Sequence, residues 1–134
     1  MKRKTKIILC IALPVILLSL LFTGLTKTIV FPDNNATLTF IYGDKNIVHT
    51  LSDAETENIR KILSTKNPDY FLLPACGFDK NISISFGNQT FSFACDGCNI
   101  AEISPFTRHI DITEEETEYI HSLFEKYGGF FPCN

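Results

Sequence analysis

An uncharged apolar run near the start of the chain, residues 7–25, most constrains what this sequence can fold into. Lys2, Arg3, Lys4 and Lys6 precede the run, and no acidic residue lies before it. A helix that crosses a bilayer needs about 20 apolar residues, whereas the apolar core of a cleaved signal peptide has about 7–15. The run therefore predicts a transmembrane anchor over residues 7–25. The basic flank over residues 1–6 is then cytoplasmic, because positive charges stay on that side.

Cleavage after export is the competing interpretation of the same run. A small-residue cleavage site can be read only at Gly24-Leu25-Thr26, which is weaker than the usual Ala-x-Ala pattern. We therefore expect a single-pass protein of the cell membrane, with its N-terminus cytoplasmic and its C-terminal domain outside. The alternative is a protein secreted after signal cleavage.

The charge of the remaining chain differs sharply from that of its start. Residues 27–134 hold eight of the 12 Lys and Arg against all 15 Asp and Glu, a formal net charge of −7 (8 − 15). Phosphate contacts require Lys or Arg side chains that displace counterions. This balance excludes nucleic acid as an expected partner.

A repeated pattern of strands and a helix predicts the fold of residues 37–134, which follow a linker over residues 26–36. Alternating apolar residues flank turns at Gly43-Asp44 and Gly87-Asn88, and each pattern indicates a hairpin. Each hairpin is followed by an amphipathic helix with a capping box. The capping pairs, Ser and Glu or Thr and Glu three residues apart, are Ser52 with Glu55 and Thr113 with Glu116.

The two patterns together predict an α+β domain of two ββα units. The second unit carries an insertion at about residues 95–111, with strands expected near residues 100–103 and 108–112 around Ser104-Pro105. We expect one antiparallel sheet with both helices packed on one face.

Four cysteines lie outside the apolar run: Cys76, Cys95, Cys98 and Cys133. An even number in a small exported domain is typical of disulfides, here two, because the core is small and the compartment is oxidising. Extending the second hairpin places Lys80 opposite Cys95 and Gly77 opposite Cys98. Cys76 is thereby predicted to reach the Cys95–Cys98 segment, and Cys133 to tie down the C-terminal tail.

Two other uses of the cysteines remain open. Cys95 and Cys98 have the spacing of a thiol-redox pair, but Cys95 follows a strand rather than beginning a helix, which does not favour a stabilised thiolate. All four cysteines could instead hold a structural zinc ion, although a second CxxC is missing. We expect disulfides, and neither a metal nor another cofactor.

No catalytic or phosphate-binding motif is recognisable in the sequence. Phe106, Phe130 and Phe131 lie off the expected core stripes, and exposed apolar residues of this kind favour contact with a partner. The expected function is therefore that of a membrane-anchored, disulfide-stabilised binding domain without enzymatic activity, with a protein or peptide as partner. The alternatives are a redox protein that uses Cys95 and Cys98, or a zinc-stabilised module.

Overall fold

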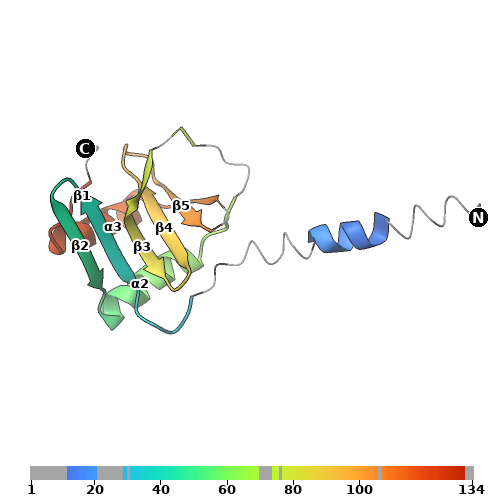
Figure 1. Cartoon of the computed structure of the whole chain (residues 1–134), viewed down its shortest axis with the longest axis horizontal. Helices are drawn as coiled ribbons and strands as arrows, with labels where there is room; N and C mark the ends of the chain where they lie inside the picture. The colour runs from blue at the N-terminus through green and yellow to red at the C-terminus, as the bar shows by residue number, and fades with distance from the viewer. Residues whose placement is uncertain are drawn as a thin grey trace, which may run out of the picture.

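The computed structural model describes residues 12–20, 29, 31–69, 74–75, 77–105 and 107–131. The domain is α+β, with a six-stranded antiparallel sheet in the order β2-β1-β3-β4-β5-β6 (Figure 1). The strands are β1 (Thr37–Tyr42), β2 (Lys45–Thr50), β3 (Phe78–Phe86), β4 (Gln89–Ala94), β5 (Ile100–Ser104) and β6 (Arg108–Asp111). The predicted strands of the insertion, β5 and β6, are confirmed.

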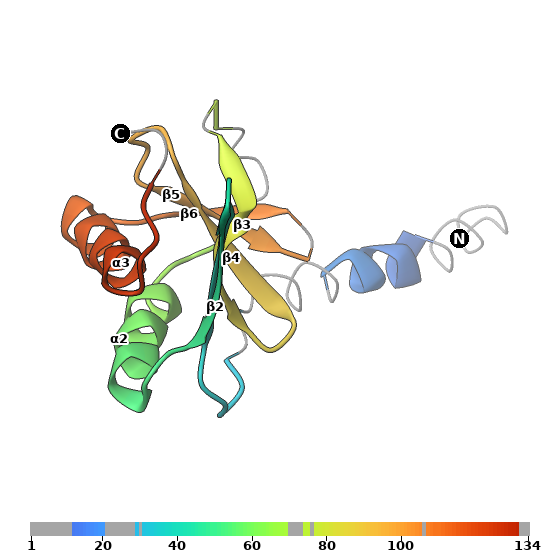
Figure 2. The ribbon, with the colours of Figure 1, turned by 60° about the vertical axis from the view of Figure 1, so that its left-hand side comes forward.

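Both helices of the domain cover the same face of the sheet, as Figure 2 shows with the sheet seen nearly edge-on. They are α2 (Asp53–Ser64) and α3 (Glu114–Lys126). Both predicted capping boxes are confirmed, with reciprocal bonds between Ser52 and Glu55 and between Thr113 and Glu116. Each box satisfies donors that the first turn of a helix leaves unpaired.

The core lies between the sheet and this helix layer. Phe40, Phe86 and Phe91 are fully buried, and the apolar stripes of the helices, including Ile59 and Phe124, close over them. Phe31 precedes the sheet and packs edge-on against Phe86, with 5.0 Å between ring centroids. The strand alternation read from the sequence therefore matches the buried face.

The register of the second hairpin departs from regular pairing in its outer half. Ser83 pairs with Ser92 as expected, but a bulge follows, and Phe78 is the residue that pairs with Ala94. The amide of Cys95 consequently donates to the carbonyl of Gly77 (3.1 Å), where regular pairing predicts Lys80. Within the bulge, the backbone N–H of Asn81 is satisfied by a side chain, because it donates to the Asp79 carboxylate at 2.9 Å.

The predicted membrane anchor requires a correction. Residues 12–20 form a helix, whereas residues 7–11 and 21–25 lie outside the described residues. Among the described residues, no helix is both long and apolar enough to cross a membrane. This finding contradicts the single-pass anchor and the membrane location expected from the sequence.

Candidate functional site

The most distinctive surface of the domain lies at the β2 edge of the sheet. Outside the helix of residues 12–20, four large apolar side chains of the described residues stay exposed: Ile41, Tyr42, Val48 and Phe130. Val48 is 64% exposed and Phe130 is 37% exposed. Three of the four belong to the β1–β2 hairpin and the fourth packs on it, so they surround the β2 edge, and we call them together the edge patch.

The edge patch has a half on each face of the sheet. Ile41 and Val48 have the parity of Thr39, which pairs with Val48 and faces away from the helices. Tyr42 has the parity of the buried Phe40 and points to the helix side. The β2 edge therefore has apolar side chains above and below the plane of the sheet.

The chain after α3 places Phe130 in this patch. Gly128 has a φ of +87°, which favours glycine, and its carbonyl accepts from the Lys45 ammonium at 2.7 Å. A Cβ on Gly129 would lie 3.1 Å from the Phe40 ring, so the backbone passes close over that ring. Phe130 then meets Tyr42 edge-on at 5.4 Å between centroids. The Lys45 ammonium also lies over the Phe130 ring, 5.3 Å from its centroid, which favours this position of the ring.

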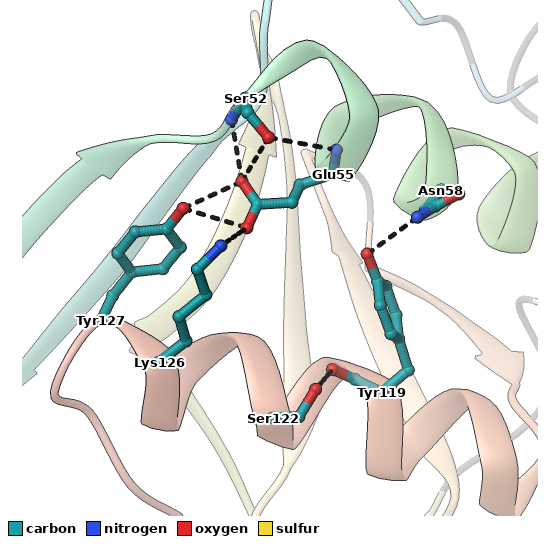
Figure 3. Close-up of polar contacts among 7 residues, drawn as sticks. All are labelled: Ser52, Glu55, Asn58, Tyr119, Ser122, Lys126 and Tyr127. Carbon is teal, nitrogen blue, oxygen red and sulfur yellow. Dashed lines mark hydrogen bonds and ion pairs between the residues drawn. The ribbon is translucent and has the colours of Figure 1, made fainter.

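A polar cluster behind the patch locks the two helices together (Figure 3). The Glu55 carboxylate of α2 accepts from the Lys126 ammonium at 2.6 Å and from the Tyr127 hydroxyl at 2.9 Å. It also accepts from the backbone N–H and the hydroxyl of Ser52. The hydrogen bond from Lys126, followed by that from Ser52, lowers the pKa of Glu55 from 4.5 to about 2. Tyr127 also stacks on His49 of β2, with 3.9 Å between centroids, which links the cluster to the edge strand.

A shallow pocket of about 370 Å³ opens between the two helices. It is lined by Asn58, Lys61, Ile62, Thr65, Glu116 and Tyr119. The Asn58 amide donates to the Tyr119 hydroxyl at 3.2 Å, and Glu116 is paired with Lys66 at 2.5 Å. Because these polar groups already satisfy one another, the pocket offers a ligand few groups that need a partner.

On the face opposite the helices, Val48 of β2 begins a row that continues with one polar residue from each of the other five strands. The register aligns Val48, Thr39, Ser83, Ser92, Glu102 and His109 in one row. Ser92 and His109 are buried, and His109 Nε2 lies 3.8 Å from Glu102 Oε2. The sequence indicated no partner for His109, because only the β5–β6 register brings Glu102 beside it.

The structure divides the predicted phenylalanine patch. Phe106 lies outside the described residues, and Phe130 is exposed as expected. Phe131 is 6% exposed and packs in the core, where it stacks on His121 at 3.8 Å and meets Phe124 at 5.1 Å. Tyr42 was missed as a surface residue because it continues the alternation of Leu38 and Phe40. Ile41 and Val48 fall on the opposite face, and the local sequence does not show whether that face is covered.

The expectation of two disulfides also requires correction. Cys95 is a buried thiol, because alternation along β4 places it on the core face with Phe91 and Phe93. Two disulfides among four cysteines need all four residues, so the prediction is wrong. Cys98 is half-buried and disulfide-bonded, but not to Cys95, which keeps its thiol. Cys76 and Cys133 lie outside the described residues.

The other uses of the cysteines find little support in the described geometry. An attacking redox thiol needs access to solvent, and Cys95 is only 5% exposed. Within the described ranges, no group of three or more His, Cys, Asp or Glu side chains is arranged to hold a metal ion.

No protein-family model, curated protein or solved structure matches this chain.

Proposed function

We propose that this domain is a polypeptide-binding module that adds an extended segment of a partner protein to its sheet along the edge of β2. The observation that carries the proposal is the edge patch, which flanks an edge strand on both faces. The binding role expected from the sequence is kept. The anchor and the disulfides are not part of the proposal.

The backbone of β2 supplies the main attraction for an added strand. The two-residue turn at Gly43-Asp44 makes Tyr42 and Lys45 a hydrogen-bonded pair. Because such pairs alternate along an antiparallel ladder, Ile47 and His49 also bond to β1, whereas Asn46, Val48 and Thr50 direct their N–H and C=O groups outward. An incoming strand can satisfy these groups, as in other cases of strand addition.

The edge strand lacks the features that normally prevent such pairing. Proteins block exposed edges with prolines, bulges, inward charges or very short strands. β2 has six residues in unbroken register, no proline, and a single charged residue, Lys45, at its end.

The opposite edge of the sheet, at β6, is protected against the addition of a strand. β6 has only four residues, and its edge is covered at His109 by an isolated bridge to Asp69. Both backbone bonds of this bridge are short, at 2.8 and 2.9 Å. Only the β2 edge therefore combines an exposed backbone with an exposed apolar surface among the described residues.

A selection of random peptides displayed on phage tests the proposal. We expect the full chain to select peptides with apolar residues at successive positions, since neighbouring side chains of a strand point to opposite faces and can therefore contact both halves of the edge patch. The decisive variant is Val48→Pro, which removes an outward N–H but no bond to β1. We expect it to weaken the selected peptides at least about tenfold, which corresponds to about 1.4 kcal/mol.

The matched control is Val48→Thr, which keeps the backbone N–H and β propensity but reduces the apolar surface. We expect a smaller loss of affinity in this variant than in Val48→Pro. A selection that yields no peptide contradicts the proposal, as do peptides whose affinity for a folded Val48→Pro variant is unchanged.

A further inference from the structure

The outward residues of β2 complement a second copy of themselves. We propose that a second copy of this chain occupies the β2 edge, so that two sheets join into one antiparallel sheet across a two-fold axis at Val48. This inference rests on the proposed function, because it names the partner of the same edge.

The antiparallel register follows from which backbone groups face outward. In a two-fold symmetric pair, if residue i of one copy faces residue j of the other, then residue j also faces residue i. Residues whose N–H and C=O groups point outward must face residues of the same kind, because only these can exchange hydrogen bonds between the copies. A two-fold axis at Val48 pairs Val48 with its own copy and Asn46 with Thr50 of the other copy. This arrangement keeps almost the whole of β2 in the new ladder.

The side chains brought together by this register are compatible. Val48 is the most exposed apolar side chain of the edge patch, and its copy would cover it directly. Asn46 and Thr50 form an uncharged polar pair, so no like charges face each other. The Lys45 ammonium is brought toward the end of the other β2, where Asp53 begins α2, which adds charge complementarity.

The protected edge at β6 limits the assembly to two copies. An open edge at each end of the sheet would allow continued addition and a fibre. Here Asp69 occupies the edge at His109, so the joined sheet ends in covered edges on both sides.

The net charge of the domain opposes the association of two copies, so the dimer should depend on salt concentration in a characteristic direction. Residues 27–134 carry a formal net charge of −7 (8 − 15) in each copy. This repulsion acts over a distance that salt screens to about 8 Å at 0.15 M ionic strength. Association of two copies should therefore strengthen as salt is added, whereas binding of a basic partner peptide should weaken.

The test combines sedimentation equilibrium with amide hydrogen exchange on the full chain, kept dispersed in a non-ionic detergent because of its apolar run. We expect sedimentation to show a dimer whose population rises with protein concentration. Its formation should slow the hydrogen exchange of the amides of Asn46, Val48 and Thr50, and leave unchanged that of the β2 amides already bonded to β1. Val48→Lys and Val48→Asp should each weaken the dimer at least about tenfold, because like charges then meet at the axis. The site is exposed, so we expect both variants to fold.

Mixing the two variants gives the sharpest outcome. Position 48 meets itself only when the axis passes through it, so an equimolar mixture of Val48→Lys and Val48→Asp should recover a heterodimer. A wild-type chain that stays monomeric at every concentration overturns the inference, and so does a dimer that these substitutions leave unchanged. A monomer that still selects peptides at the β2 edge overturns the second copy as partner and leaves the proposed function standing.

Discussion

Lys126 of α3 donates a 2.6 Å hydrogen bond to Glu55 of α2, across a separation of 71 residues in the sequence. Glu55 also completes the capping box of its own helix, so one carboxylate both caps the first turn of α2 and joins α2 to α3 (Figure 3). The charge of this buried side chain therefore contributes to holding together the helix layer that supports the β2 edge.

The lowered pKa of Glu55 makes the stability of the domain depend on acid. The pKa falls from 4.5 to about 2 on folding, first because of Lys126, so the folded state binds a proton less readily than the unfolded state. This stabilisation is complete above pH 4.5 and is lost as the pH falls toward 2. Urea unfolding between pH 6 and 2 should show the loss.

Glu55→Gln should remove most of this pH dependence while the capping box is kept, because Gln can also cap. We expect a cost of about 1–2 kcal/mol at pH 7, since a charged acceptor of several hydrogen bonds is lost. Glu116→Gln in the equivalent box of α3 is the comparison: burial opposes the hydrogen bond from Lys66 that lowers the pKa of Glu116, so this variant should remove a smaller part of the pH dependence. An unchanged acid profile in Glu55→Gln would show that another group is responsible.

His121 predicts a second, milder sensitivity to acid near neutral pH. Burial lowers its pKa below 6.5, although Glu125 opposes the shift, and its ring stacks on Phe131. Because the folded state favours the neutral ring, stability is present above pH 6.5 and declines as the pH falls below it. His121→Phe should flatten the melting temperature between pH 7.5 and 5.5, and Glu125→Gln should make its fall steeper. A slope equal to that of the wild type in both variants contradicts this assignment.

Neighbouring phenylalanines at the C-terminal end should separate stability from binding. Phe131→Ala leaves a cavity in the core and should lower the free energy of unfolding by about 3 kcal/mol. Phe130→Ala should cost about 1 kcal/mol or less, because the ring is partly exposed, yet it should weaken peptides bound at the edge patch. Chemical denaturation and peptide titration of the two variants distinguish these effects. Equal stability losses would place both rings in the core.

Cys95 should react slowly with thiol reagents while the domain is folded. Its side chain is 5% exposed, so alkylation by iodoacetamide requires local opening. Mass spectrometry should find Cys95 modified far more slowly in buffer than in denaturant. Rapid modification of the native protein would revive the redox interpretation of Cys95 and Cys98.

The features that could be predicted from the sequence are those that depend on nearby residues. The capping box of Ser52 and Glu55 and the turn at Gly43 each involve residues within a few positions of one another. Their geometry is therefore encoded locally, and alternation assigned the core face correctly at Phe40 and Phe91. The bulge in β3 was missed because the hairpin was extended in regular pairing beyond Ile82, although three consecutive polar residues, 79–81, interrupt the alternation there.

The candidate site depends on relationships that cross the whole chain. The sequence by itself determined that a hairpin turns at Gly43-Asp44 and that Ile47 and Val48 face opposite sides of its second strand. Only the tertiary structure decided that β2 is an edge strand, because strand order is set by how β1 pairs with β3, far away in the sequence. The same long-range packing buries Phe131 and leaves Phe130 partly exposed. The sequence alone does not show this difference, because it does not indicate which side of the segment after α3 meets the core.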